Sequence, residues 1–331
     1  MKKRNLGTTG LSVGELGLGC MGMSWAYAES SRDDSESIAV VRAALDAGST
    51  LIDTALVYGD GHNEELVGRA IAGRRADAVI ATKGGLVVDD IVTKGMHNDA
   101  RPENLTRQID LSLTRLGVDF IDLYYLHRVD PAVPLEESWG AMAEAVAAGK
   151  VRNLGLSEVT VAQAAIAQAI HPVSAIQSEF SLWARDPQGS TATSPLAPTG
   201  FGNVIGWTAE HGAAFVPFSP LGRGFLTGAI THETKLEEHD FRSKNPRFTA
   251  DALAASQHIA EAVALIAARH DASSAQVAIA WVLAQGEHII PIPGTRSLTH
   301  LTDNLGGSEL TLSPADLLLL DDLPAPAAPR Y

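Results

Sequence analysis

LIDTALVYGDGHNEELVGRAI, residues 51–71, begins like a strand and ends like a helix, with polar residues at the change. A mostly apolar run leads to Asp53, and Tyr58 follows beside Gly59 and Gly61. Apolar residues then recur at helical spacing. A buried strand, a short loop and a helix form the repeating unit of α/β folds. The segment therefore predicts one such unit, with an acid and a tyrosine where the strand ends.

The same alternation of strand and helix continues along the chain. Strands are expected at 15–20, 49–54, 77–83, 119–127, 150–157, 174–180, 213–220 and 288–294. Helices are expected at 37–48, 63–73, 101–117, 135–149, 159–170, 201–212, 252–269, 273–285 and 313–322. The strands are apolar throughout, as in parallel sheets that are covered on both faces. An α/β fold of the (β/α)8 TIM barrel type fits 331 residues, and an open doubly wound sheet is the alternative.

No break in composition marks a second domain, so residues 1–331 are expected to form one barrel domain. The segments 84–100, 184–200 and 222–250 are the least regular. The last of them is long for a connection, which predicts a lid or a mobile segment. The tail at about 323–331 is rich in proline and alanine and is expected to be disordered.

Composition limits the partners and the compartment. The chain has 25 Lys and Arg against 39 Asp and Glu, a net charge of −14. Such a surface disfavours nucleic acid as a partner. Cys20 is the only cysteine, so a disulfide framework is excluded and a reducing, cytoplasmic location is expected. No apolar run reaches the roughly 18 residues of a membrane span, and the oligomeric state is left open.

Two motifs near the N-terminus are misleading. Lys2, Lys3 and Arg4 precede LGLGC as in a lipoprotein signal, but polar residues interrupt the apolar run that export requires. Gly17, Gly19 and Gly22 spell the dinucleotide fingerprint G-x-G-x-x-G. In that motif a helix opens at once, whereas helix signals here begin only near residue 34.

Four polar residues stand at or beyond the ends of expected strands, where barrel enzymes place their chemistry: Asp53, Tyr58, Lys83 and His127. Taken singly, Asp53 could cap a turn, Lys83 could lie on the surface and His127 could be a satisfied core histidine. Together they form a coherent group, because a buried Lys83 requires a counter-ion and Asp53 lies on the neighbouring strand.

This group suits proton transfer to a carbonyl oxygen. An ammonium beside a phenol lowers the pKa of the phenol, so Lys83, oriented by Asp53, is expected to make Tyr58 a proton donor. His127 is expected to orient the substrate oxygen. Because the group contains neither a nucleophile nor a metal cluster, a hydride cofactor is expected to supply the electrons. Its phosphates suit IPGTRSLTHLTDN (292–304), with Thr295, Arg296 and Ser297, or FSPLGRGFLTG (218–228), with Arg223.

These segments resemble the aldo-keto reductase family, in the same order and over nearly the whole chain. The resemblance rests on LGTTGLSVGELGLGCMGM (6–23), the opening stretch, VIATKGG (79–85), DLYYLHRVD (122–130), GKVRNLGLSE (149–158), SEFSLW (178–183), FSPLGRGFLTG and IPGTRSLTHLTDNL (292–305). It implies a (β/α)8 barrel closed at its base by a short N-terminal β-hairpin, NADPH as cofactor, and a catalytic tetrad of Asp53, Tyr58, Lys83 and His127 with Tyr58 as general acid.

The resemblance also implies cofactor contacts. Ser157 and Gln177 would hold the carboxamide, and Phe218 would flank the ring where many members have Tyr. Ser219, Leu221, Gly222 and Arg223 would wrap the pyrophosphate, and Gly294, Thr295 and Arg296 would meet the adenosine-side phosphate. Asn304 would meet the adenine. Further contacts are implied for Gly22, Met23, Asp53, Pro220, His300 and Asp303. Many members have Lys-Ser at the positions of Gly294-Thr295 and Arg at the position of His300, so Arg296 is expected to compensate.

Two functions follow from the resemblance, and a third class is weighed against them. The first is NADPH-dependent reduction of a small carbonyl substrate, an aldehyde or a ketone, in a pocket lined by Trp25, Tyr27, Tyr58, His127, Arg128 and Trp183. The second is a cofactor-binding regulatory role, as in the potassium-channel β subunits that share this fold. A barrel hydrolase is the third, and the chain shows neither an evident nucleophile nor a metal cluster for it.

Overall fold

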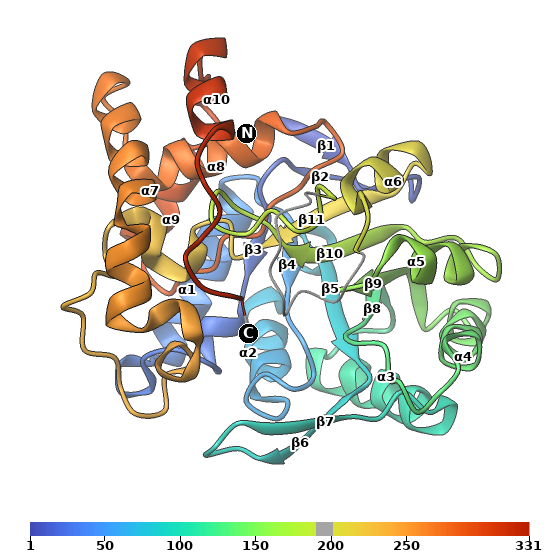
Figure 1. Ribbon diagram of the computed structural model, residues 1–331. Coiled ribbons are helices and arrows are strands. Elements are labelled where there is room, and N and C mark those ends of the chain that lie inside the picture. Colours follow the sequence, from blue (N-terminus) through green and yellow to red (C-terminus); the bar gives the residue numbers. More distant parts are fainter. Residues whose placement is uncertain (190–200, 331) are drawn as a thin grey trace.

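In a computed structural model, which describes residues 1–189 and 201–330, seven parallel strands form one curved sheet (Figure 1). The order across the sheet is β11-β10-β9-β8-β5-β4-β3. The strands are β3 (Leu18–Gly19), β4 (Leu51–Asp53), β5 (Val79–Gly84), β8 (Ile121–Leu126), β9 (Val151–Ser157), β10 (Ala175–Glu179) and β11 (Ala214–Phe218). They coincide with seven of the eight expected strand segments, and β5 alone runs past its expected segment, by the one residue Gly84.

Residues 288–294 close the sheet into a barrel without forming a regular strand. Ile290 and Ile292 donate backbone hydrogen bonds to β11, at the carbonyls of Phe215 and Pro217. On the other side, the carbonyls of Pro291 and Pro293 accept from Gly17 and Gly19. A proline has no N–H to donate, so on the side of β3 Pro291 and Pro293 accept hydrogen bonds but donate none. The expected eighth strand is therefore a proline-interrupted closing segment, and the (β/α)8 barrel is confirmed.

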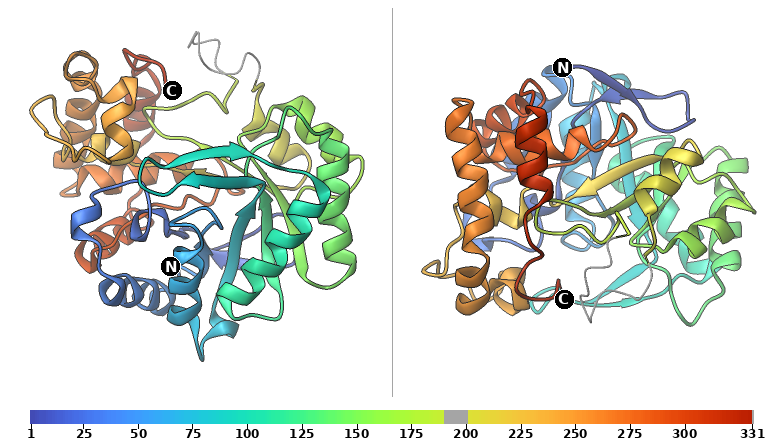
Figure 2. Two further views of the ribbon diagram at one scale, coloured as in Figure 1. Left: turned by 90° about the horizontal axis from the view of Figure 1, so that it is seen from below. Right: turned by 45° about the horizontal axis from the view of Figure 1, so that its top comes forward.

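Helices surround the barrel (Figures 1 and 2). They are α1 (Asp34–Asp46), α2 (His62–Ile71), α3 (Pro102–Leu116), α4 (Leu135–Ala147), α5 (Val161–Gln168), α6 (Val204–Glu210), α7 (Ala250–Arg269), α8 (Ser274–Ala284), α9 (Leu298–Gly306) and α10 (Pro314–Asp321). Local sequence fixes their ends. For example, α3 starts with Pro102 and stops at Gly117, whose φ of 65° is left-handed and favours glycine.

Two antiparallel hairpins accompany the barrel. The expected N-terminal hairpin is present as β1 (Lys3–Asn5) and β2 (Ser12–Gly14). A second hairpin, β6 (Leu86–Asp90) paired with β7 (Gly95–Asn98), lies at the bottom of Figure 1. It occupies most of 84–100, which was expected to be irregular. LVVDD is short and does not alternate between apolar and polar residues, so its sequence lacks the pattern that indicates a strand.

The C-terminal segment differs from the expected disorder. Residues 323–330 run from α10 back across the molecule (Figure 1). Arg330 is buried and pairs with Glu158 and Glu179, and its carbonyl accepts a hydrogen bond from Asn245. These ion pairs, together with hydrogen bonds from Arg247 to the carbonyl of Ala328 and from the N–H of Ala327 to Ser256, fasten a segment whose composition alone predicts no structure. Of the segment 184–200, which was expected to be irregular, residues 190–200 lie outside the described residues.

Side chains alternate between the barrel interior and the helix layer, and this alternation positions the site. Apolar residues that share an interior cluster include Leu51, Ala81, Leu123, Tyr125 and Ala175. Four polar residues follow members of this cluster by two positions, toward the carboxyl ends of the strands: Asp53, Lys83, His127 and Gln177. The interior row therefore changes from apolar to polar at one end of the barrel, which is where barrel enzymes hold their active sites.

Candidate active site

Asp53, Lys83 and Tyr58 form a connected group at this end of the barrel. Lys83 Nζ donates to Asp53 Oδ1 at 2.5 Å and to the carbonyl of Thr54 at 2.8 Å. It also lies 3.4 Å from Tyr58 Oη, within hydrogen-bonding reach. All of these side chains are buried. The spacing in the sequence correctly indicated that Asp53 is the counter-ion of Lys83.

Burial and charge act against each other in this group. Burial alone would lower the pKa of Lys83, but Asp53 and Tyr58 raise it above its ordinary value, so the ammonium is retained. Burial raises the pKa of Tyr58, and Lys83 opposes only part of that rise. The net direction for Tyr58 is opposite to the lowering expected from the sequence, because the expectation counted the charge and not the desolvation. Tyr58 is therefore protonated at neutral pH and available as a donor.

His127 lies beside Tyr58, with ring centroids 6.0 Å apart and the rings nearly perpendicular. Its backbone N–H donates to the carbonyl of Gly84, which ties it to the end of β5. Burial, followed by the charges of Arg128 and Lys83, holds the pKa of His127 well below its usual range. The ring is thus neutral at pH 7, and one of its nitrogens can donate a hydrogen bond to a substrate oxygen.

The turn that carries Tyr58 has an unusual backbone. Gly59, Asp60 and Gly61 all have left-handed φ values, of 65°, 51° and 97°. Such values favour glycine, and an aspartate tolerates them better than most residues. The chain reverses here and α2 begins at His62. This explains the two glycines that follow Tyr58.

The residues expected to hold the carboxamide lie at the ends of β9 and β10. Gln177 donates from its side-chain amide to Asp53 Oδ2 at 2.7 Å. Ser157 accepts a hydrogen bond from Arg128 Nη1 at 3.0 Å. Both are buried next to the Asp53–Lys83 pair. The structure therefore joins the expected cofactor residues Ser157 and Gln177 to the expected catalytic group, and brings Arg128 beside them.

The segment after β11 is strained where the pyrophosphate was expected. Ser219 and Arg223 adopt left-handed φ values of 52° and 57°, which are rare for residues other than glycine and cluster at functional sites. The turn comprises Phe218, Ser219, Pro220, Leu221 and Gly222, and continues into a 3-10 helix at Gly222–Thr227. Arg223 forms an ion pair of 2.8 Å with Glu179, a residue that the sequence reasoning missed although it lies two positions after Gln177 on β10.

Residues 294–304 surround the start of α9. Gly294 pairs with Gly19 of β3, and a Cβ on Gly294 would lie 2.9 Å from the carbonyl of Gly19, so two segments approach closely there. Ser297 caps α9 by accepting from the N–H of His300, and its own N–H donates to Thr295. The sequence correctly predicted a helix start at this point, which is a favourable place for a phosphate.

Further side chains in this region are engaged with neighbouring loops. Arg296 donates to the carbonyl of Ala28 at 3.2 Å and to Ser31 Oγ at 3.1 Å. Asp303 accepts from Ser273 Oγ, and Asn304 is buried. Arg296 thus bridges the loop after β3 and the start of α9. A guanidinium carries five donors, so these two bonds leave donors for a further anion.

The expected substrate residues divide into two groups. Trp25 shares an apolar cluster with Tyr58, and Tyr27 packs against the same cluster. Met23 is buried in the main core and Gly22 precedes it in the turn Met21–Met23. Trp183 instead stacks on Phe225 at 4.1 Å and is almost fully buried. The structure therefore brings Trp25 and Tyr27 toward Tyr58 and places Trp183 in a separate aromatic packing.

A second buried group of charges lies beside the carboxyl ends of β9 and β10. Glu158, which follows Ser157 and has a φ of 56°, pairs with Arg330. Glu179 is held between Arg223 and Arg330. Both acids and Arg330 escaped the sequence reasoning, because a lone arginine after a Pro/Ala-rich run gives no signal of its partners. The C-terminus is therefore part of the wall around the site.

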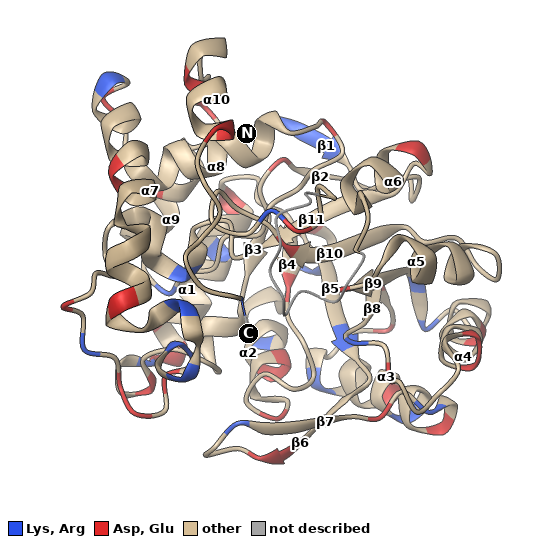
Figure 3. Ribbon diagram, in the orientation of Figure 1, with Lys and Arg blue, Asp and Glu red and all other residues tan. Residues whose placement is uncertain are grey.

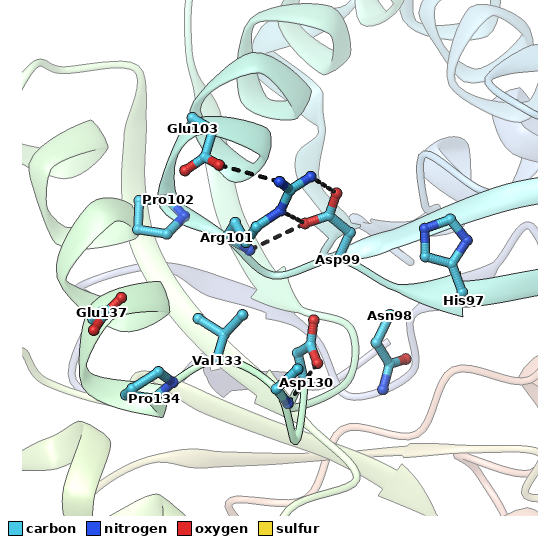
Figure 4. A pocket seen from close by; sticks show the side chains of 11 residues that line it. His97, Asn98, Asp99, Arg101, Pro102, Glu103, Asp130, Val133, Pro134 and Glu137 are labelled. Carbon is cyan, nitrogen blue, oxygen red and sulfur yellow. Dashed lines mark hydrogen bonds and ion pairs between the residues drawn. The ribbon is translucent and has the colours of Figure 1, made fainter.

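A further pocket opens among the loops that follow β5 and β8, at the same end of the barrel but lined by residues other than those named above. It has a volume of about 530 Å³ and is bounded by β7 and the starts of α3 and α4 (Figure 4). Three of its acids are engaged, Asp99 and Glu103 with Arg101, and Asp130 with the backbone of Ala100 and Ala132. Charged residues of both signs are spread over the helices and over the segment between β11 and α7 (Figure 3). Within residues 1–189 and 201–330 there is no cluster of His, Cys, Asp and Glu suited to a metal ion. The described helices include none that is both long and apolar enough to cross a membrane.

Comparison with known proteins gives one consistent result. The family model described as the aldo/keto reductase family matches residues 15–324. A probable aldo-keto reductase from Glycine max is 39% identical over 316 residues, which cover 94% of this chain and 86% of the relative. A glycerol dehydrogenase from Gluconobacter oxydans superimposes with a TM-score of 0.83 at 28% identity, covering 99% and 98% of the two chains. An aldo-keto reductase from Klebsiella pneumoniae, solved in complex with NADPH, has a TM-score of 0.73 at 25% identity, covering 99% and 97%.

Proposed function

This chain belongs to the aldo/keto reductase family of oxidoreductases, and we propose that it reduces an aldehyde or ketone to an alcohol with NADPH, using Tyr58 as the general acid. The observation that carries the proposal is the buried group in which Lys83 Nζ contacts both Asp53 and Tyr58 beside the ring of His127. A phenol, an ammonium and a neutral imidazole all donate hydrogen bonds, and together they suit an oxygen that becomes negative during reaction.

The proposed chemistry assigns each residue one task. A carbonyl oxygen held by Tyr58 Oη and a nitrogen of His127 is polarised by both donors. NADPH, when bound, supplies the hydride that reduces the carbonyl carbon. Tyr58 passes its proton to the oxygen as negative charge develops there. Lys83, kept charged by Asp53, stabilises the phenolate that remains on Tyr58.

The residues around this group fit a dinucleotide. The left-handed Ser219 and Arg223, the close approach of Gly19 and Gly294, and the start of α9 at Ser297 offer backbone N–H groups and a guanidinium to phosphates. Ser157 and Gln177 offer a hydroxyl and an amide for the carboxamide, with Phe218 beside the ring. The remaining contacts are proposed for Gly22, Met23, Asp53, Pro220, Leu221, Gly222, Thr295, Arg296, His300, Asp303 and Asn304. An NADPH complex of a relative supports the choice of cofactor.

The substrate is proposed to be a small carbonyl compound that reaches Tyr58 and His127 past aromatic side chains. Trp25 and Tyr27, from the loop after β3, pack in or against the cluster that holds Tyr58. Arg128 is proposed for the polar edge of this pocket, because it already bonds Ser157. Trp183, packed between Phe225 and Phe248, is proposed to pack beneath the residues that line the pocket.

The test is a fluorescence titration with NADPH and NADH, followed by a panel of carbonyl compounds such as 4-nitrobenzaldehyde and methylglyoxal. Aldehyde-dependent oxidation of NADPH is the expected result. Tight NADPH binding without turnover across a broad panel would favour the alternative, a cofactor-binding regulatory protein, over the reductase. Failure to bind either nucleotide would overturn both.

A further inference from the structure

Asn63, the second residue of α2, connects three segments that meet at the proposed site. It is fully buried, and its side-chain amide uses both its donor and its acceptor atoms. Asn63 Oδ1 accepts from Thr54 Oγ1 at 2.6 Å. Asn63 Nδ2 donates to the carbonyl of Cys20 at 2.9 Å and to Ser24 Oγ at 2.8 Å.

Asn63 and two of its partners, Thr54 and Cys20, form hydrogen bonds directly with the proposed catalytic residues. The backbone N–H of Asn63 donates to the carbonyl of Tyr58 at 3.1 Å. The backbone carbonyl of Thr54 accepts from Lys83 Nζ. The N–H of Cys20 donates to the carbonyl of Asp53. Asn63 therefore holds the Tyr58 turn through its backbone N–H, and through its side chain it holds Thr54 and Cys20, which contact Lys83 and Asp53.

Ser24 continues this chain of hydrogen bonds outward. Its hydroxyl lies 2.7 Å from His62 Nδ1, and His62 Nε2 lies 3.2 Å from Asp34. A Ser–His–Asp series of this kind resembles the array of a hydrolase. However, Ser24 is buried, and its oxygen receives the hydrogen of Asn63. The series is better placed to anchor Asn63 to α1 than to attack a substrate.

We propose that Asn63 is a positioning residue that holds Tyr58 and Lys83 at their working separation. The inference rests on the proposed role of Tyr58 as general acid. Lys83 Nζ and Tyr58 Oη are 3.4 Å apart, at the long end of hydrogen-bonding distance, so a small displacement breaks their contact. Without the Asn63 amide, the Tyr58 turn keeps its left-handed residues and the contact between His62 and Ser24, but loses the bonds from Asn63 to Cys20 and Ser24 in the loop after β3.

The test compares three single variants under single-turnover conditions. Asn63→Ala removes the side-chain amide with its three hydrogen bonds. Thr54→Val removes only the hydroxyl that donates to Asn63 and keeps the backbone carbonyl that accepts from Lys83. Asn104→Ala is the matched control, because Asn104 is also a buried asparagine in the first turn of a helix and also donates to a backbone carbonyl, that of Asp99. Thermal unfolding of all three shows whether their losses of stability are comparable.

We expect Asn63→Ala to slow the reduction step by about 10- to 100-fold, the usual effect of misplacing a catalytic group by a fraction of an ångström to an ångström. NADPH affinity and the KM for the carbonyl compound should change by less than about threefold, since Asn63 is assigned no contact with either. The solvent deuterium isotope effect should increase in Asn63→Ala and Thr54→Val, because proton delivery from Tyr58 becomes harder, and should not change in Asn104→Ala. Joining Asn63→Ala and Thr54→Val should add little to Asn63→Ala alone.

The inference is overturned if Asn63→Ala reduces the substrate within about twofold of the wild-type rate while losing stability as Asn104→Ala does. It is also overturned if the rate and the NADPH affinity fall and KM rises together, with an unchanged isotope effect. If Asn63→Ala does not fold, the Thr54→Val variant decides by the same measures. A wild-type protein that binds NADPH but reduces no carbonyl compound would instead refute the proposed function, which separates the two failures.

Discussion

Lys83 Nζ lies 2.5 Å from Asp53 Oδ1 inside the barrel, and the two side chains are only 1% and 4% exposed. A buried charge that loses its partner destabilises a protein by about 3–5 kcal/mol, while removal of both partners is far less harmful. Lys83→Met and Asp53→Asn should therefore each lower the free energy of unfolding by an amount in that range. The double variant should recover part of the loss and remain inactive, as measured by urea denaturation and by NADPH oxidation. Additive losses would show that the two residues do not act as a pair.

Tyr58→Phe removes one oxygen atom and leaves the ring that packs beside His127. A general acid contributes about 10²- to 10⁴-fold to a rate, so reduction of any active aldehyde should fall by at least that range. NADPH binding should remain within about threefold of wild type, because the hydroxyl is assigned to the substrate and not to the nucleotide. Fluorescence titration and steady-state kinetics measure the two quantities. A collapse of NADPH binding would remove Tyr58 from its assigned role.

Arg296 is the residue assigned to the phosphate that distinguishes NADPH from NADH. Its guanidinium is fixed by Ala28 and Ser31 and is always charged. Arg296→Ala should weaken NADPH binding by about 2–4 kcal/mol in free energy, as for loss of a charge-assisted contact, and NADH binding much less. Parallel titrations of both nucleotides measure the difference. Equal weakening would mean that Arg296 acts on the loop at 28–31 rather than on the phosphate.

His127 should make the stability of the protein sensitive to acid. Burial holds its pKa well below the usual value of about 6.5. The unfolded chain therefore takes up a proton first as the pH falls below about 6.5, and the contribution of neutral His127 to stability is lost progressively down to its folded pKa. Stability curves from pH 7 to pH 5 should be flatter for His127→Asn than for the wild type. A slope that is unchanged by the substitution would assign the acid sensitivity to other groups.

The sequence predicted most of the barrel because its strands carry their own signals. Apolar runs ending in Asp53 and Lys83 gave both the strand ends and the pairing of two charges. The segment 288–294 was placed correctly, but Pro291 and Pro293 prevent it from forming a regular strand. They do so because both positions face β3, where a strand residue would donate its N–H, and the sequence does not show which way each position faces. The pKa of Tyr58 was misjudged in direction, because desolvation depends on how completely the fold encloses the ring.

Contacts between distant segments were the part that no local pattern could provide. The β6–β7 hairpin is held by pairing between 86–90 and 95–98, and its strands are too short for periodicity to reveal. Asn63 belongs to a stretch that was singled out from the start, yet two of its three side-chain partners, Cys20 and Ser24, lie on the loop after β3. Glu158 adopts a left-handed backbone and pairs with Arg330, which lies more than 170 residues further along the chain.

The C-terminal arginine provides a further test, because its partners are buried acids. Arg330 pairs with Glu158 and lies 3.6 Å from Glu179, whose pKa burial alone would raise but Arg223, Arg330 and Arg247 together lower. Arg330→Ala should reduce the free energy of unfolding by about 1–3 kcal/mol, since Glu179 retains its other partners.

The matched control is Arg101→Ala, which breaks an exposed pair with Asp99 and should cost less than about 1 kcal/mol. The charged form of Glu179 stabilises the fold above the unfolded pKa of about 4.3, and this contribution is lost as the pH falls below that value. Arg330→Ala should therefore weaken the dependence of stability on pH in the acid range as well as lower stability at pH 7. The free energies of unfolding are measured by urea denaturation at pH 7 and in the acid range. Equal losses for the two substitutions would show that residues 323–330 are not held to the barrel through Arg330.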